Sequence, residues 1–141
     1  MFIGISTGAP AMDKRSVFLI FAALGLTPIA LSYGAAPAAS LTPLFGFAVE
    51  PPNLTHIFRA VMGLYLALAG FWVAGALNRA LRVPALWSLV IFMLGLAAGR
   101  VLSLALDGVP HWLLSVYLLL EIGFGLVGIW LLRGEAAPRQ A

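Results

Sequence analysis

Four long apolar stretches, separated by shorter segments that carry most of the polar residues, divide the chain. They cover residues 17–33, 54–77, 84–106 and 111–132. A helix of about 20 apolar residues crosses the hydrocarbon core of a bilayer, and the last three stretches reach that length. The first stretch is shorter and contains Pro28, a residue that kinks or ends helices. The pattern predicts four transmembrane helices.

Residues typical of helix ends stand at the borders of these stretches. Asn53 is expected to cap the second helix, and Pro84 and Pro110 are expected to occupy the first turns of the third and fourth. Asp107 and Gly108 indicate that the third helix ends in a tight turn. The sequence therefore predicts where each helix begins and ends.

The connections differ in length. Links 78–83 and 107–110 are short, so we expect the helices they join to be antiparallel neighbours, with the third helix touching the second and the fourth. The connection 34–53 is longer and apolar, and Thr42 with Pro43 is expected to start a single helical turn in it. This segment either rests on the lipid headgroups or forms a lid over an opening between the helices.

Composition supports a membrane protein. Hydrophobic residues make up 62% of the chain and charged residues 9%, and the mean hydropathy is +1.05. Soluble domains have about 45–50% hydrophobic and about 25% charged residues. Without cysteine the chain has no disulfides and no thiolate metal sites. We predict an all-α membrane protein, an antiparallel bundle of four transmembrane helices in one domain over residues 16–133. Segment 1–15 precedes this domain in the sequence, and the tail 134–141 follows it.

The charges outside the apolar stretches are distributed unevenly. Six basic residues lie on one side of the predicted membrane: Lys14, Arg15, Arg79, Arg82, Arg133 and Arg139. The segments on the other side contain Glu50 and Asp107 and no basic residue. The positive-inside rule then predicts cytoplasmic termini, an external segment 34–53 and a multi-pass protein of the bacterial cytoplasmic (inner) membrane. Basic residues that flank apolar stretches, rather than gathering on one face, argue against nucleic-acid binding.

The N-terminal region allows more than one interpretation. Residues 1–11 show no helical pattern, and Met12, which precedes Asp13, is a plausible translation start. The first apolar stretch and the small residues at 36–38 also resemble a cleavable signal peptide. We favour a retained first helix, because three helices would leave the interior face of a four-helix packing open.

Three charged residues lie inside the apolar stretches: Arg59, Arg100 and Glu121. A charge near the bilayer centre costs about 2.5–3.5 kcal/mol on insertion scales, so such residues usually face the protein interior and pair. Helical side chains lean toward the N-terminus of their helix, which brings Arg100 and Glu121 together on antiparallel helices. Arg59 is expected to lie above this pair and to lean outward, toward Glu50 and Asp107.

Small and polar residues at helical spacing indicate the inward faces. On the second helix they are His56, Arg59, Gly63, Ala67, Gly70 and Ala74. On the third they are Arg100, Ser103 and Asp107, and on the fourth Tyr117, Glu121, Gly125 and Gly128. These faces are expected to meet inside the bundle.

Metal and haem sites are less well supported. His56 and His111 could bind a metal together with Glu50 and Asp107, but the nearby arginines make that site electrostatically unfavourable. Haem would need the two histidines to face each other. The tryptophans are expected to form an aromatic belt near the span ends: Trp72, Trp87, Trp112 and Trp130. We expect no metal and no cofactor.

Two functional hypotheses remain. In the first, the charged cluster only fixes helix packing, and the protein is a non-enzymatic structural or interaction protein that packs with itself or with another membrane protein. In the second, an outward-facing pocket binds a small anionic or lipid-like ligand. Its candidate residues are His56, Arg59, Arg100, Ser103, Asp107, Tyr117 and Glu121. No nucleophile–base pair accompanies them, so we do not expect an enzyme. A proton relay is disfavoured because the inner half of the spans lacks charges.

Three segments carry a family resemblance. They are NLTHIFRAVMGLYL at 53–66, GRVLSLALDGVP at 99–110 and YLLLE at 117–121. With these the chain resembles, over about residues 37–132, a family of small bacterial membrane proteins known as domain of unknown function 4345. The resemblance implies a four-helix membrane protein and no established activity or cofactor. Residues 1–11 fall outside the pattern.

Overall fold

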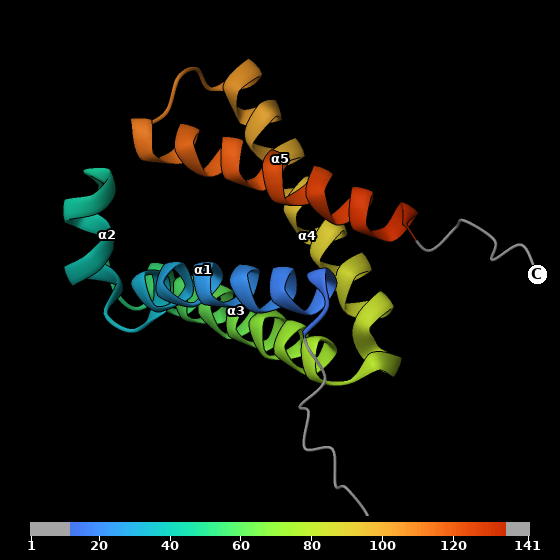
Figure 1. Ribbon diagram of the computed structural model, residues 1–141. Coiled ribbons are helices and arrows are strands. Elements are labelled where there is room, and N and C mark those ends of the chain that lie inside the picture. The colour runs from blue at the N-terminus through green and yellow to red at the C-terminus, as the bar shows by residue number, and fades with distance from the viewer. Residues whose placement is uncertain (1–11, 135–141) are drawn as a thin grey trace, which may run out of the picture.

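The computed structural model describes residues 12–134, and within that range it contains helices and no strand (Figure 1). The helices are α1 (Lys14–Gly34), α2 (Pro37–Phe45), α3 (Asn53–Leu77), α4 (Arg79–Leu106) and α5 (Trp112–Arg133). α1, α3, α4 and α5 are long and apolar enough to cross a membrane, so the four predicted stretches do form long apolar helices. The expectations for residues 1–11 and for the tail after residue 134 lie outside the described residues.

α4 begins earlier than predicted. Asn78 alone separates it from α3, and the Asn78 side chain caps α4 by accepting a hydrogen bond from the Ala80 amide (2.9 Å). Pro84 therefore lies inside α4 instead of in its first turn. Because the polar Arg79 and Arg82 interrupt the apolar pattern, the sequence predicts a link at these residues where the structure has a helix.

Two other predicted helix starts are also wrong by a residue or two. Asn53 is the first residue of α3 and makes no capping bond. Pro110 precedes α5, and His111 caps this helix. The Nδ1 atom of His111 accepts a hydrogen bond from the Leu113 amide (3.4 Å). The end of α4 is as predicted, since Asp107 caps it and Gly108 adopts a φ of 93° that side chains disfavour.

The long connection contains a helix of nine residues, more than the single turn expected. α2 begins at Pro37, which suits a first helical position, and it ends at Gly46 in the left-handed conformation (φ 77°). The Phe45 ring contacts Tyr33 at the end of α1 and His111 at the start of α5, with centroid distances of 6.4 and 6.3 Å. α2 thus connects these two helix ends (Figure 1).

The long helices pack as two pairs. α1 lies beside α3, α4 packs on α5, and α3 also contacts α4 (Figure 1). The predicted contacts of the third span with the second and fourth are therefore present. The buried core comes mainly from α1, α3 and α4, and its most enclosed members are Leu19, Ala30, Trp72, Ala85, Leu86 and Leu89.

Polar contacts join the helices at the end where α1 begins. The Ser16 hydroxyl donates to the Ala76 carbonyl of α3 (2.9 Å), and Arg82 of α4 pairs with Asp13 (2.7 Å). Arg15 donates to the Leu131 carbonyl of α5 (3.2 Å). These bonds connect all four long helices at one end.

The inward face of α3 differs from the prediction. The predicted stripe is largely exposed, Gly63 and Gly70 having open space around them. The buried face carries Tyr65, Ala69 and Trp72 instead. Trp72 is fully buried and donates to the Ser88 hydroxyl (3.0 Å), so it does not belong to an aromatic belt. On α5 the predicted stripe does face inward, with Glu121, Gly125 and Gly128 buried.

Candidate functional site

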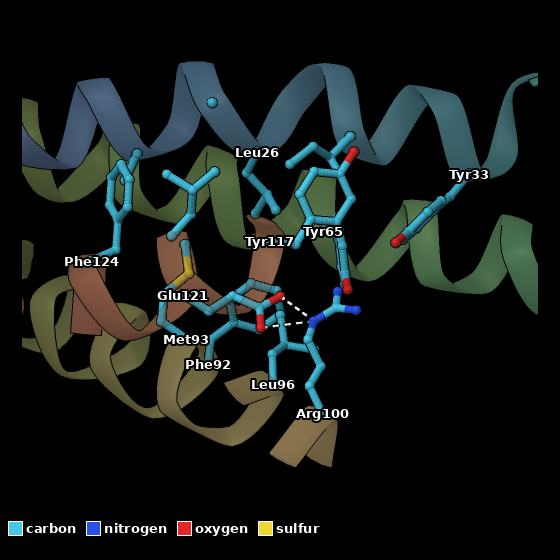
Figure 2. Close-up of a pocket in the computed structure, with 14 residues that line it drawn as sticks. Leu26, Tyr33, Tyr65, Phe92, Met93, Leu96, Arg100, Tyr117, Glu121 and Phe124 are labelled. Atoms are coloured by element: carbon cyan, nitrogen blue, oxygen red, sulfur yellow. Dashed lines mark hydrogen bonds and ion pairs between the residues drawn. The ribbon is translucent and has the colours of Figure 1, made fainter. Parts of the chain in front are cut away.

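A partly open cavity of about 90 Å³ lies between the two helix pairs (Figure 2). Figure 2 shows side chains of α1 and α3 approaching it from one side and those of α4 and α5 from the other. The lining is mostly apolar and comes from all four long helices: Ala22, Gly25, Leu26, Ile29, Tyr33, Tyr65, Phe92, Met93, Leu96, Arg100, Tyr117, Leu120, Glu121 and Phe124. Such a cavity with a few polar groups is typical of a small-molecule site.

An ion pair borders this cavity. The Arg100 Nε of α4 donates to both carboxylate oxygens of Glu121 on α5, each at 2.8 Å. The Glu121 side chain is 9% exposed and that of Arg100 is 22% exposed. The pair was predicted from the sequence, and it satisfies two charges that would otherwise be expensive in an apolar environment.

Tyrosines surround the guanidinium. Tyr33 of α1 lines the cavity together with Arg100, and the Arg100 Cζ lies 5.7 Å from the centre of the Tyr117 ring, within the range of a cation–π contact. Tyr65 of α3 packs against Tyr33 at a centroid distance of 5.8 Å. Each of the four long helices therefore contributes a polar group near one end of the cavity (Figure 2).

The lining changes character along the helices. Tyr33 and Arg100 lie near the ends of α1 and α4, and Tyr117 lies near the start of α5. These three residues are therefore at the end of the molecule where α2 lies. Ala22 and Phe124 lie nearer the middle of their helices, and there the lining is apolar. The cavity is thus polar toward one end of the molecule and apolar toward its middle.

The structure brings together only part of the predicted site. Arg100, Tyr117 and Glu121 line the cavity. Ser103 donates to the Asp107 carboxylate (2.8 Å) at the exposed end of α4. Ser103 lines a separate small cavity of about 70 Å³ that shares Arg100 with the first.

Arg59 and His56 do not belong to either cavity. Both are exposed on α3, and within residues 12–134 Arg59 forms no ion pair with Glu50 or Asp107. The expected position of Arg59 above the Arg100–Glu121 pair is therefore wrong. The reason is the rotation of α3, which turns Tyr65 and Trp72 inward and the small-residue stripe outward.

Sequence reasoning missed Tyr33 and Tyr65, the polar groups that α1 and α3 contribute. A tyrosine inside an apolar stretch is easily taken for a membrane-interface residue. A signal was nevertheless present, because Tyr65, Ala69, Trp72 and Ala76 recur at the i, i+4, i+7, i+11 spacing of one helix face.

The chemistry of the cavity is that of hydrogen-bond donation. Over residues 12–134 no group of three or more His, Cys, Asp or Glu side chains is positioned to hold a metal ion. An arginine offers five N–H donors, and Glu121 occupies only the one on Nε. The terminal nitrogens and the tyrosine hydroxyls can serve a bound molecule that carries acceptors.

Comparison with known proteins identifies the family. The family model described as domain of unknown function DUF4345 matches residues 15–132. The chain belongs to this family, as its resemblance had implied. No curated protein and no solved structure matches it.

Proposed function

We propose that this member of the DUF4345 family is a non-enzymatic membrane protein that binds an amphipathic, lipid-like molecule in the cavity between its helix pairs. The polar head would lie against Arg100 and the tyrosines. The chain of the molecule would follow the apolar lining toward Phe124. The cavity is partly open, so the remainder of the molecule can extend into the surrounding lipid.

The position of the Arg100–Glu121 pair carries this proposal. A pair that serves only to hold two helices together needs no space beside it, and well-packed interiors contain few voids. Here the pair borders a cavity on the α1 and α3 side, and three tyrosines from different helices converge on that space. Ionisable groups inside membrane spans commonly mark binding sites.

The proposal includes an orientation in the membrane. The four long helices would form an antiparallel bundle in the bacterial inner membrane, with both termini in the cytoplasm, because the basic residues gather at the end where α1 begins. The polar end of the cavity would then lie toward the outer surface and the apolar end toward the bilayer centre. A lipid of the outer leaflet has the same arrangement of head and chain.

Filling the cavity tests the proposal. Gly25 lines the cavity, and a Cβ at this position would meet no other atom within 4 Å. Gly25→Leu should therefore fold, since it replaces a glycine by a better helix former, yet place a side chain where the ligand would lie. Native mass spectrometry from a mild detergent should detect a bound species on the wild type. In Gly25→Leu the occupancy of this species should be at least about tenfold lower.

Gly123→Leu is the matched control. Gly123 is exposed on α5, also has open space around it, and does not line the cavity. This variant should keep the bound species and the thermal stability of the wild type. If the wild type carries nothing, or if Gly25→Leu retains as much as Gly123→Leu, the cavity is not a binding site.

The exposed face of α3 supports a second candidate function, association with a second copy or with another membrane protein. Gly63, Gly70 and Arg59 lie on this face, and the two glycines would let another helix approach closely. Both functions can coexist, because the face points away from the cavity.

A further inference from the structure

The charge of the cavity limits the kind of head it can bind. Among the residues that line it, Arg100 carries the positive charge and Glu121 the negative one, and they are paired at 2.8 Å. The remaining polar lining consists of Tyr33, Tyr65 and Tyr117, which are neutral side chains. The site is therefore electrically neutral in sum.

Within residues 12–134 no other cation lines the cavity to balance an incoming anion. Arg59 is exposed on α3 and does not line the cavity. Five further basic residues lie at the opposite ends of the helices: Lys14, Arg15, Arg79, Arg82 and Arg133. A phosphate or carboxylate would thus enter an apolar space as an uncompensated charge, which is costly even when hydrogen-bonded.

The cavity has more donors than acceptors. The four terminal N–H groups of Arg100 and the three tyrosine hydroxyls can donate, whereas Glu121, which accepts the Nε–H of Arg100, is the one lining side chain that can only accept. A neutral oxygen that accepts hydrogen bonds would satisfy these donors without adding charge. A hydroxyl, ester or ketone oxygen has this property.

The size of the cavity limits the head further. An apolar cavity of about 150 Å³ holds benzene, and this one has about 90 Å³. It accommodates a head of a few heavy atoms, and a long chain must leave through the open side. The bulky charged heads of common phospholipids exceed this space.

We propose that the ligand is a neutral lipid with a small oxygen-bearing head, such as a long-chain alcohol, and that Glu121 excludes anionic heads by neutralising Arg100. This inference rests on the proposed function, because it specifies what the same cavity binds.

A pair of probes that differ by one phosphate group tests it. The full chain in mild detergent would be incubated with oleyl alcohol or with its phosphate ester, oleyl phosphate, and occupancy followed by native mass spectrometry. The wild type should bind the neutral probe at least about tenfold more tightly. In Glu121→Gln the amide oxygen can still accept from Arg100, but the negative charge is gone, so the preference should move at least about tenfold toward the phosphate.

The outcomes separate the two proposals. If the wild type prefers the phosphate ester or binds both probes equally, the proposal of a neutral head is wrong, while the proposal that the cavity binds a lipid stands. If the wild type binds neither probe, both proposals are overturned. Gly25→Leu should bind neither probe, which locates binding in the cavity. Should Glu121→Gln fail to fold, the preference of the wild type still decides.

Discussion

Asp13 serves two purposes at the end of the molecule where the helices are joined. One carboxylate oxygen accepts from the Ser16 amide (2.8 Å) and caps α1, and the other accepts from Arg82 of α4 (2.7 Å). Burial acts to raise the pKa of this carboxyl, but the hydrogen bonds from Ser16 and the charges of Arg82 and Arg15 outweigh it. The pKa lies below its ordinary value of 3.8 as a result.

A lowered pKa makes this contact sensitive to acid. The unfolded chain binds the proton more readily, so Asp13 stabilises the fold above about pH 4 and loses that effect as the pH falls through its folded pKa. Asp13→Asn keeps a capping side chain and cannot titrate. Between about pH 6 and pH 3 its melting temperature in detergent should fall less than that of the wild type.

The difference corresponds to no more than about 1 kcal/mol, because the Asp13 side chain is 48% exposed and its ion pair is screened by solvent. Thermal melting followed by circular dichroism at both pH values measures it. Identical pH responses of the two proteins would show that Asp13 has no effect on stability in acid.

At the scale of the helix, α3 presents two different faces. Tyr65 and Trp72 are buried against α1 and α4, while Gly63 and Gly70 are exposed with open space around them. An exposed stripe of small residues on a lipid-facing helix allows close approach of another helix. This face is where association of two copies would occur.

Gly70→Leu tests that association. A Cβ added at this position meets no atom of the same chain within 4 Å, so the melting temperature should remain that of the wild type. Dimer formation, measured by light scattering in detergent, should weaken at least about tenfold because leucine keeps the helices apart. Gly123→Leu on α5 places the same bulk on another exposed surface and should leave association unchanged. If Gly70→Leu associates as strongly as the wild type, this face of α3 is not the interface between two copies.

The face of α3 also shows what the sequence could and could not predict. The span itself was predictable, since its length and hydropathy suffice. Its rotation was not, because in lipid the outward residues are as apolar as the inward ones and hydropathy does not distinguish the faces. The stripe of small residues therefore predicts a packing face that the structure leaves exposed, and it predicts for Arg59 a site that Arg59 does not join.

The ion pair was predictable for the opposite reason. Arg100 and Glu121 are charges within apolar spans, and the need to pair them fixes how α4 and α5 face each other. The cavity beside them depends on how the α1 and α3 pair meets the α4 and α5 pair. That angle follows from side-chain packing along several helices, and no local pattern in the sequence reports it.

At the scale of the whole molecule, the proposed topology puts α2 on the outer side of the inner membrane and the α3–α4 link on the cytoplasmic side. The chain contains no cysteine, so a single introduced one reports its own side of the membrane. Ala39→Cys on α2 should react with a membrane-impermeant maleimide on cells whose inner membrane is intact. Ala80→Cys at the start of α4 should react only after that membrane is permeabilised. Both positions are exposed, and the reverse pattern would invert the topology.

The length of α4 has a consequence for the protein in its bilayer. Its 28 residues extend about 42 Å, whereas the hydrocarbon core is about 30 Å thick. Arg79 and Arg82 can bring the first turn into the interfacial region, and tilting accommodates the remaining excess. Hydrophobic mismatch then couples bilayer thickness to the inclination of α4, which carries Phe92, Met93, Leu96 and Arg100 into the cavity wall. We expect thinner membranes to tilt α4 further, so that the thickness of the host membrane helps to set the width of the cavity.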